Sequence, residues 1–319
     1  MASWRDTLKD IINTQSSRVY FDRALKHYST FQIGGPAECL IIVNSIQDLI
    51  NIIKFVNKHN LPLYTIGNGS KILFPSQTLS GITIKLGKHF NYIRERNQQI
   101  VVGAATPLSK IINFTSNHSL SGVEFLAGIP ATLGGALFCN AGAFGHDIGS
   151  RVVTINGINN YGEEVQLTRK DLNFTYRQSN LQSNFIITEA ILELALKDSK
   201  LIRQDIAYYL KYRQHAHPWG ASVGSIFKNP RDQHNQTIPA GKLIEQAGLK
   251  KMRCGDAEVS SHHANFIINK KNARARDVYE LIQIIKSIVE LKYKIILQEE
   301  IQIFPKYVEV KKWQNQKEQ

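Results

Sequence analysis

The sequence feature that most constrains the fold is a run of small residues at positions 128–145, which reads GIPATLGGALFCNAGAFG. This glycine-rich stretch has five glycines, four alanines and one proline, and no charged side chain. Such a run is either a seam where helices pack closely or a loop whose backbone approaches a ligand. Pro130, the pair Gly134-Gly135 and Asn140 argue against a continuous helix. Because bare N–H groups can face an anion, the pattern favours a ligand-binding loop.

A second glycine turn lies upstream, within residues 63–73, which read LYTIGNGSKIL. A predicted strand runs into Gly67-Asn68-Gly69-Ser70, called here the GNGS turn. A strand followed by a glycine turn and a hydroxyl can form a backbone cradle for a pyrophosphate. The motif is neither G-x-G-x-x-G nor a Walker loop, so it indicates neither a Rossmann nor a P-loop fold. By itself, a hairpin or helix-cap turn would look the same.

Composition limits the class of protein. The chain has 319 residues, 43% hydrophobic and 20% charged, as expected for a globular chain of two or three domains. No apolar run reaches membrane-spanning length and no secretory signal opens the chain, so we expect no membrane contact. The three cysteines are widely spaced and form no C-x-x-C pair. This spacing argues against disulfides and a zinc site, and it fits a cytoplasmic location.

The chain is strongly basic, with 39 Lys and Arg against 26 Asp and Glu, a net charge of +13. A basic protein attracts anions, and nucleic acid is one candidate. However, the basic residues are spread along the chain and no RNA-binding motif occurs. Anionic dinucleotides and nucleotide sugars fit the same charge, which can also mean only solubility. The pairs His215/His217 and His262/His263 lack a third ligand of suitable spacing, so we expect no metal.

Together, the two glycine motifs resemble the FAD-binding module of the vanillyl-alcohol-oxidase type of flavoproteins. Within that group, residues 28–304 resemble the UDP-N-acetylenolpyruvoylglucosamine reductase (UDP-N-acetylmuramate dehydrogenase) family. Four further blocks carry this resemblance: TFQIGGPA at 30–37, YRQS at 176–179, GSIFKNP at 224–230 and HANF at 263–266. The short span between the second and third blocks matches the subclass that lacks an extra tyrosine-bearing loop.

Three positions depart from the family pattern. Ala131 stands where the family usually has glycine, Lys71 stands where asparagine is usual, and Asp256 replaces a common glycine. These changes put flavin contacts in doubt but remove no reacting group.

The resemblance implies an α+β fold, in which a two-part FAD-binding module of the PCMH/vanillyl-alcohol-oxidase type precedes an α+β substrate-binding domain. We expect FAD-binding subdomain 1 at residues 1–80 and FAD-binding subdomain 2 at 81–197. The substrate-binding domain with a closing strand should occupy 198–304, and a basic tail 305–319.

Hydrophobic periodicity adds local expectations. Residues 1–26 should form a helix and a linker. A serine-capped helix should follow Ser45, with Asp48 as its partner in a capping-box-like arrangement. Further helices are expected at 107–118, 201–214 and 274–293. Their buried faces should be formed, in this order, by Leu108, Ile111, Ile112 and Thr115; by Ile202, Ile206, Tyr209 and Leu210; and by Val278, Leu281, Ile282, Ile285, Ile288 and Leu291. Strands are expected at 39–43, 63–66, 82–86, 100–102, 152–155, 164–167, 185–196 and 295–304.

The resemblance implies a reaction in which NADPH reduces FAD and the reduced flavin passes hydride to an enolpyruvyl ether on a UDP-sugar. This step belongs to peptidoglycan precursor synthesis in the cytoplasm. Arg177 would stabilise the developing enolate and Ser225 would donate the proton. Without the motif, an arginine after tyrosine is commonly a surface residue, and a serine after glycine commonly belongs to a turn.

Glu300 is the third catalytic candidate, since it matches the second acidic residue of the family's closing pattern. In a strand at 295–304, Glu299 shares a face with Leu297 and Ile301, whereas Glu300 shares the polar face with Gln298 and Gln302. Face parity and motif spacing therefore both select Glu300. The alternative for either residue is a solvated charge on an edge strand.

The binding residues follow from the same motifs. Lys228 and Asn229 are expected substrate contacts, with a capped turn ended by Pro230 as the alternative, and Arg213 is a candidate contact for the UDP phosphates. Non-covalent FAD should contact Ile66, Gly67, Asn68, Gly69, Ser70, Lys71, Gly128, Ile129, Pro130, Ala131, Gly134, Gly135, Asn140, Ala141, Gly142 and Gly145. The expected partners are the UDP-sugar and NADPH, with no nucleic acid, membrane or required protein partner.

Two rival functions remain open at this point. A flavin-dependent alcohol oxidase with the same FAD module would consume oxygen and often carry a covalent flavin. A nucleic-acid-binding protein would be colourless and would bind DNA in a salt-sensitive way.

Overall fold

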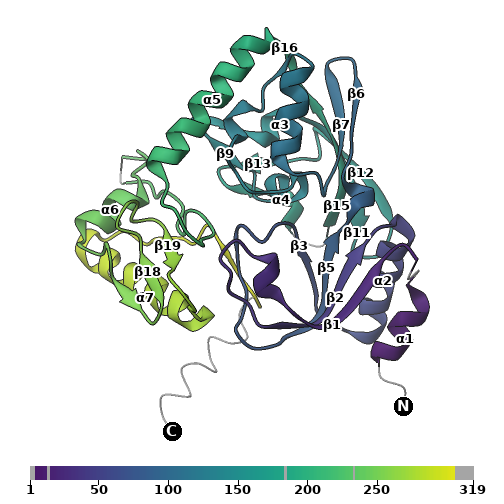
Figure 1. Cartoon of the computed structure of the whole chain (residues 1–319), viewed down its shortest axis with the longest axis horizontal. Helices are drawn as coiled ribbons and strands as arrows, with labels where there is room; N and C mark the ends of the chain where they lie inside the picture. Colours follow the sequence, from purple (N-terminus) through teal and green to yellow (C-terminus); the bar gives the residue numbers. More distant parts are fainter. Residues whose placement is uncertain (1–3, 13–14, 183–184, 233, 306–319) are drawn as a thin grey trace. The chain divides into compact units, whose positions relative to one another are not determined.

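The computed structural model describes residues 4–12, 15–182, 185–232 and 234–305, and the expected basic tail lies outside the described residues from 306 on. The chain divides into two compact units (Figure 1). Unit 1 contains the chain up to Phe21, Cys39–Asn68 and Ser80–His215. Unit 2 contains Asp22–Glu38, Gly69–Leu79 and the chain from Ala216 on. The limits at residues 80 and 197 separate domains that were expected from the ligands they bind, and they stay predictions.

The first sheet lies mainly in unit 1 and has the strand order β1-β2-β5-β3. Its strands are β1 (Arg18–Ala24), β2 (Pro36–Val43), β5 (Leu79–Leu86) and β3 (Leu63–Ile66), the last two parallel. The prediction of a linker before residue 26 was wrong, because β1 occupies part of it. The sequence RVYFDRA carries three charges, which an edge strand tolerates because one side of its backbone is unpaired.

Helices α1 (Trp4–Ile11) and α2 (Ile46–His59) bury apolar side chains with this sheet. The predicted cap of α2 is confirmed: the Ser45 side chain accepts a hydrogen bond from the Asp48 N–H at 3.0 Å. The Asp48 carboxylate is buried and accepts from the hydroxyl of Ser16 at 2.9 Å. The helix ends at Asn60, which adopts the left-handed conformation common after a helix.

The second sheet belongs wholly to unit 1 and is antiparallel, in the order β12-β11-β15-β7-β6. Its strands are β12 (Glu164–Thr168), β11 (Val152–Asn159), β15 (Phe185–Glu193), β7 (Gln99–Gly103) and β6 (Ile93–Arg96). Helix α3 (Leu108–Asn117) buries Leu108, Ile111, Ile112 and Thr115, as predicted. Short pairs complete this part: β8 (Leu120–Ser121) with β16 (Ala195–Leu196), β9 (Gly142–Ala143) with β10 (His146–Asp147), and β13 (Phe174–Thr175) with β14 (Gln178–Ser179).

Helix α5 (Ser199–Ala216) ends unit 1 and confirms the helix predicted there, but not its whole buried face. Ile202 is fully buried, whereas Leu210 is 39% exposed. Ile206 and Tyr209 only partly enter the core of the second sheet. The apolar stripe of α5 is therefore covered near its start and open to solvent farther along.

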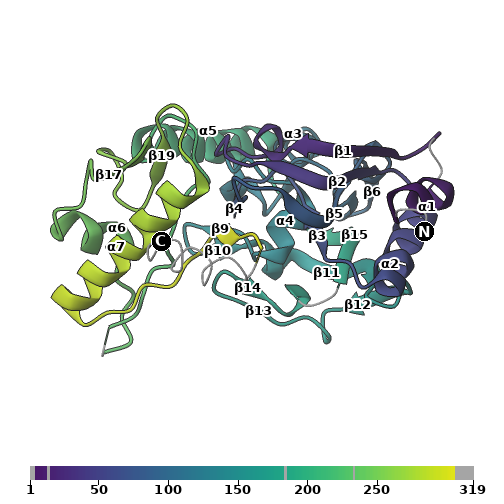
Figure 2. The ribbon, with the colours of Figure 1, turned by 90° about the horizontal axis from the view of Figure 1, so that it is seen from below.

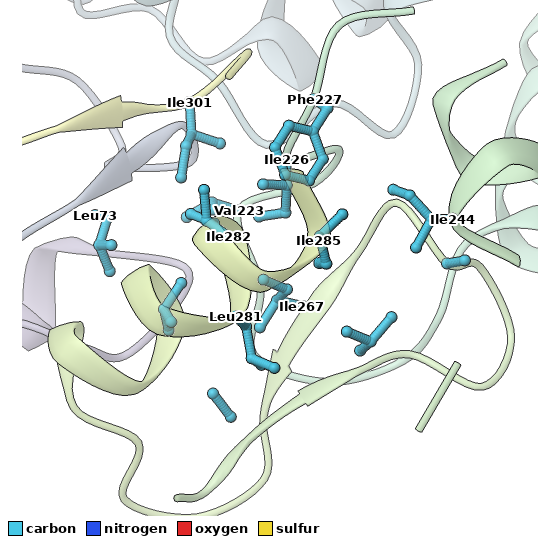
Figure 3. Close-up of a cluster of buried hydrophobic side chains, with 14 of the residues drawn as sticks. Leu73, Val223, Ile226, Phe227, Ile244, Ile267, Leu281, Ile282, Ile285 and Ile301 are labelled. Carbon is cyan, nitrogen blue, oxygen red and sulfur yellow. The ribbon is translucent and has the colours of Figure 1, made fainter. Parts of the chain in front are cut away.

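Unit 2 is built around α7 (Ala275–Tyr293), whose apolar face packs on the sheet β17-β18-β19 and on α6 (Ala240–Gln246) (Figures 2 and 3). The strands are β17 (Arg253–Cys254), β18 (Ala257–Val259) and β19 (Ile267–Asn269). The predicted stripe of α7 is right for Val278, Leu281, Ile282 and Ile285 and wrong for Leu291, which is 74% exposed. Val289 is buried instead, because the 3.6-residue period keeps it on the core face.

The closing strand expected at 295–304 is much shorter in the structure. Only β20 (Gln302–Ile303) is a strand, parallel to β4 (Ile72–Leu73), and Glu299 forms an isolated bridge with Phe227. The segment pairs with Phe227 at Glu299 and with β4 at Gln302–Ile303, so no continuous ladder of hydrogen bonds forms. The predicted alternation nevertheless survives at Leu297 and Ile301, which are both buried.

Candidate active site

Gly67 and Asn68, the first half of the GNGS turn, meet the glycine-rich stretch inside unit 1. The side chain of Asn68 lies 3.5 Å from the carbonyl oxygen of Pro130. A β-carbon on Gly67 would lie 2.7 Å from the hydroxyl of Thr132, which is closer than real contacts allow. The first half of the GNGS turn therefore rests directly on the glycine-rich stretch, and Gly67 permits this approach.

The glycine-rich stretch is neither a plain loop nor a long helix. It contains one short helix, α4 (Leu133–Phe138), which begins at Thr132 and includes both central glycines. The expectation that Gly134 and Gly135 oppose a helix was wrong for this pair, which lies inside α4. The stretch as a whole is nevertheless not one continuous helix. A β-carbon on Gly134 would lie 3.2 Å from the β-carbon of Ala104, whereas one on Gly135 would meet only the Thr132 hydroxyl, at 3.5 Å. A β-carbon on Gly134 would thus be crowded by Ala104, whereas one on Gly135 would make only an ordinary van der Waals contact.

Lys85 binds the backbone of the GNGS turn, a role that was not predicted from the sequence. Its ammonium donates a hydrogen bond to the backbone carbonyl of Gly67. Burial lowers the pKa of Lys85. A lysine at the penultimate position of β5 gives little sequence signal, because only the parallel pairing of β3 with β5 brings it to the turn.

Arg177 sits at the tip of the hairpin β13–β14, which unit 1 holds against the glycine-rich stretch (Figure 2). The Asn140 side chain donates to the Thr175 carbonyl at 2.8 Å, and the Ser179 hydroxyl donates to the Phe138 carbonyl at 2.8 Å. Arg177 has a φ of +55°, a conformation that costs a non-glycine residue about 1–2 kcal/mol. Such strain is typical of functional sites, where surrounding contacts hold the residue in place.

Both polar atoms of the Asn140 side chain have hydrogen-bond partners within the protein, since its oxygen also accepts from the Gly149 N–H at 3.0 Å. A bare backbone at Gly142 lets Arg177 come close, because a β-carbon there would lie 3.1 Å from a guanidinium nitrogen. The predicted FAD contact at Asn140 and the predicted catalytic arginine are therefore parts of one scaffold.

Arg213 of α5 binds the backbone that leads into the glycine-rich stretch. Its guanidinium donates to the backbone carbonyls of Ala127 at 2.7 Å and Phe125 at 3.1 Å. Burial lowers the pKa of Arg213, and the positive charge of Arg177 lowers it further. These bonds give Arg213 a structural role in the FAD module, and its expected contact with UDP phosphates stays a prediction.

In unit 2, Ser225 and Glu300 lie on adjacent backbone segments. The Glu300 N–H donates to the Ile226 carbonyl at 2.7 Å, and the Lys228 N–H donates to the Gln298 carbonyl at 2.9 Å. Side chains next to both residues are anchored in the core around α7: Val223, Ile226, Phe227 and Ile301 (Figure 3). The core thereby fixes the two short segments that carry the predicted proton-handling groups.

Lys71 joins these two segments. Its ammonium lies 2.7 Å from a Glu300 carboxylate oxygen and donates to the backbone carbonyl of Ser225 at 2.9 Å. The main chain of Lys71 also takes part, since its carbonyl accepts from the Gln302 N–H at 2.7 Å. Gly224 has a φ of +76°, and a β-carbon on it would lie 3.7 Å from the ammonium. The sequence interpretation listed Lys71 as a flavin contact and missed this link.

Glu299 and Glu300 form separate ion pairs. Glu299 lies 2.8 Å from the ammonium of Lys286 on α7, whereas Glu300 lies beside Lys71. The Glu300 side chain is also the more buried, with 11% exposed against 27% for Glu299. The structure therefore separates a carboxylate paired at the α7 surface from one placed next to Ser225.

Two further residues of unit 2 hold the Ser225 segment in shape. Buried Asn265 accepts from the Phe227 N–H and donates to the Phe227 carbonyl, both at 2.9 Å. His263 accepts from the Asn265 N–H at 3.2 Å, and burial is the main cause that lowers its pKa. The HANF block signalled the family but its role as a clamp on the GSIFKNP block could be seen only in the fold.

Asn229 of the GSIFKNP block has a helix-capping contact. Its side-chain oxygen accepts from the Ala240 N–H at 2.9 Å, at the first residue of α6. This contact ties the GSIFKNP block to the start of α6. The substrate contacts of Asn229 and Lys228 stay predictions.

The described residues offer no group of three or more His, Cys, Asp or Glu side chains that could hold a metal ion. Within the same residues, no helix has the length and apolar character needed to cross a bilayer.

The backbone of unit 1 fits a dinucleotide cofactor. The first half of the GNGS turn lies against the glycine-rich stretch, a β-carbon on Gly135 would make only an ordinary contact with the Thr132 hydroxyl, and one on Gly145 would meet no atom within 4 Å. Bare glycine backbone of this kind admits the close approach that a pyrophosphate or flavin needs.

Comparison with known proteins places the chain in its class. A family model described as an FAD binding domain matches residues 37–167, so the chain is an FAD-dependent flavoprotein. A second model, described as the C-terminal domain of UDP-N-acetylenolpyruvoylglucosamine reductase, matches residues 214–304. The two matches confirm the predicted fold class, an FAD module followed by an α+β domain.

Whole-chain relatives identify the family. The UDP-N-acetylenolpyruvoylglucosamine reductase of Halalkalibacterium halodurans is 37% identical over 291 residues, which cover 91% of this chain and 95% of that protein. The Bacillus subtilis enzyme of the same name is 34% identical and covers 93% and 97%. The solved structure of the Thermus caldophilus reductase matches with a TM-score of 0.77 at 31% identity, covering 91% of this chain and 100% of that one. The chain belongs to the UDP-N-acetylenolpyruvoylglucosamine reductase family.

Proposed function

We propose that this protein reduces the enolpyruvyl group of UDP-N-acetylglucosamine enolpyruvate to give UDP-N-acetylmuramate, with NADPH as the source of hydride. The reaction belongs to peptidoglycan precursor synthesis, and we place it in the cytoplasm. One observation carries the assignment of the site: in a chain of this reductase family, Ser225 and Glu300 lie on hydrogen-bonded neighbouring segments joined by Lys71.

The chemistry that FAD supplies when bound is hydride transfer, from NADPH and then to the terminal carbon of the alkene. The residues proposed to hold the cofactor are those of the GNGS turn and the glycine-rich stretch, chiefly through their backbone groups. Lys85 keeps the GNGS turn in shape by binding the Gly67 carbonyl.

Protonation is the task of the side chains in unit 2. Hydride addition leaves negative charge on the carbon next to the substrate carboxylate, and that carbon must gain a proton. Ser225 donates it, and Glu300 assists the proton's delivery. A serine is a weak acid in water, so its neighbours must stabilise the serine oxygen as the proton leaves.

Arg177 stabilises the negative charge that develops on the substrate carboxylate. A guanidinium stays charged and offers paired donors to two oxygens, which suits an enolate-like transition state. The strained tip of the hairpin fixes the base of this side chain. Lys228 and Asn229 contact the substrate and Arg213 lies near its phosphates. The protein needs no nucleic acid, membrane or second protein for this reaction.

The test separates the two halves of the reaction. The purified protein should be yellow and hold one non-covalent FAD per chain. Under anaerobic conditions NADPH should bleach the flavin, and the enolpyruvyl UDP-sugar should restore its visible absorbance within seconds. Bleached flavin that the UDP-sugar fails to reoxidise would overturn the proposal.

The two alternative functions predict different results in the same absorbance experiment. An alcohol oxidase would reoxidise its flavin with oxygen and leave the UDP-sugar unchanged. A nucleic-acid-binding protein would carry no flavin colour. The family relation favours the reductase over both.

A further inference from the structure

We propose that Lys71 is a positioning residue that holds the Glu300 carboxylate beside Ser225 for the protonation half of the reaction. The inference rests on the proposed function. It concerns a residue that was expected only to contact the flavin.

The contacts of the Lys71 ammonium carry the proposal. It lies 2.7 Å from Glu300 Oε1 and donates at 2.9 Å to the backbone carbonyl of Ser225. Both are normal distances for charge-assisted hydrogen bonds. One cation thus binds the side chain of one proposed proton-handling residue and the main chain of the other.

The position of Lys71 is itself fixed by the fold. Its carbonyl accepts from the Gln302 N–H, and the next residue, Ile72, begins the strand that pairs with Gln302–Ile303. The lysine side chain is 29% exposed, and the Glu300 side chain is 11% exposed. The ion pair is therefore anchored at both ends by backbone bonds and partly shielded from water, so it restricts the carboxylate more than a surface pair does.

The ion pair of the preceding residue, Glu299, provides a matched control. Glu299 pairs with Lys286 at 2.8 Å, and the two side chains are 27% and 28% exposed. The two pairs have similar geometry, but only the Lys71 pair adjoins Ser225. A general effect of removing a lysine–glutamate pair can therefore be separated from an effect on protonation.

The experiment compares Lys71→Met with Lys286→Met in the FAD-loaded protein, by anaerobic stopped-flow absorbance. For Lys71→Met we expect flavin bleaching by NADPH within about twofold of the wild-type rate. Reoxidation by saturating enolpyruvyl UDP-sugar should slow by about 10- to 100-fold, the usual cost of a misplaced reacting group. Lys71→Arg, which keeps a cation, should recover part of that loss. Lys286→Met should leave both rates unchanged.

A double-mutant cycle tests whether Lys71 acts through Glu300. If it does, Lys71→Met should slow reoxidation much less when Glu300 is already glutamine, so the two losses should not multiply. Should Lys71→Met fail to fold or lose its flavin, Lys71→Gln, which keeps a donor without the charge, provides the same cycle. Flavin content and thermal unfolding are measured for every variant.

The outcomes decide between the ideas. Selective slowing of reoxidation, recovery by arginine and losses that do not multiply support the proposal. Equal slowing of both halves, fully multiplied losses, or a Lys71→Met variant that behaves like Lys286→Met overturns it. If the UDP-sugar does not reoxidise the wild-type flavin at all, the proposed function fails. If the wild type turns over normally and the Lys71 variants reoxidise at the same rate, only the role of Lys71 fails.

Discussion

The glycine-rich part of unit 1 and the Ser225 region of unit 2 use opposite means to form a site. In unit 1, Gly67 and Gly135 present bare backbone, and the shape of the chain is the functional property. In unit 2, three separate segments converge, since the Lys71 ammonium binds both the Glu300 carboxylate and the backbone carbonyl of Ser225. A backbone site is sensitive to added volume, whereas a side-chain cluster is sensitive to lost atoms.

This difference matches the two tasks of the proposed reaction. A cofactor that stays bound needs a tight surface of complementary shape. Protonation needs a few groups held within a fraction of an ångström, and the buried core around α7 supplies that rigidity through Val223, Ile226 and Ile301 (Figure 3). The predictions below test whether volume affects only cofactor retention and side-chain chemistry affects only the second half-reaction.

The largest effect is expected for Ser225→Ala. Flavin bleaching by NADPH should stay near the wild-type rate, because no protein acid acts in that step. Reoxidation by the enolpyruvyl UDP-sugar should slow by about 10²–10⁴-fold, the usual contribution of a positioned acid. Ser225→Cys should recover part of the rate, since a thiol can also donate a proton. Stopped-flow absorbance follows both halves, and equal slowing of the two would give Ser225 a structural role only.

Exchange of the two neighbouring carboxylates sharpens the comparison within unit 2. Glu300→Gln should lower turnover by about 10²-fold, because it removes the carboxylate next to Ser225. Glu299→Gln should leave turnover unchanged and lower the free energy of unfolding by about 1 kcal/mol or less, since its pair with Lys286 is partly exposed. Steady-state kinetics and urea unfolding of both variants provide the measurements. The reverse ranking in turnover would mean that the wrong face was assigned to the reaction.

Added volume in unit 1 should affect the cofactor. Gly135→Val should weaken FAD binding by about 5- to 150-fold, the equivalent of the roughly 1–3 kcal/mol cost of overpacking. Gly134→Val is the matched variant, and it should lower the melting temperature instead, because its β-carbon faces Ala104 at 3.2 Å. Flavin absorbance after gel filtration and thermal unfolding separate the two results. A folded Gly135→Val protein with full flavin occupancy would contradict the cradle assignment.

The smallest effect concerns pH and the clamp behind Ser225. Burial lowers the pKa of His263, so the unfolded chain binds a proton more readily than the folded one. The stability that His263 contributes is therefore complete above about pH 6.5, its ordinary pKa, and is lost as the pH falls from there toward the lowered value. A protonated ring could not accept the Asn265 N–H.

Urea unfolding between pH 8 and pH 5.5 checks this prediction. The wild type should lose stability relative to His263→Gln with a slope of at most about 1.4 kcal/mol per pH unit, the limit for one proton. Parallel curves for the two proteins would show that His263 keeps its ordinary titration in the folded state.

Much of the local structure could be predicted from the sequence because local patterns determine it. Ser45 and Asp48 set the start of α2, and the apolar spacing of residues 108–115 set the buried face of α3. The glycine motifs showed where backbone approaches a ligand, and alternation along 297–301 separated Glu299 from Glu300. These are properties of neighbouring residues, which the order of the chain states directly.

The tertiary structure alone decided which distant groups meet. Only the pairing of β3 with β5 brings Lys85 to the GNGS turn, and only the pairing of β4 with β20 brings Lys71 to Glu300. The charged strand β1 and the shortened closing strand were predicted wrongly for the same reason, because an edge position or a change of partner leaves no periodic signal. A sequence records the spacing along one chain, whereas a hydrogen bond between residues 71 and 300 depends on how the core around α7 folds the chain back on itself.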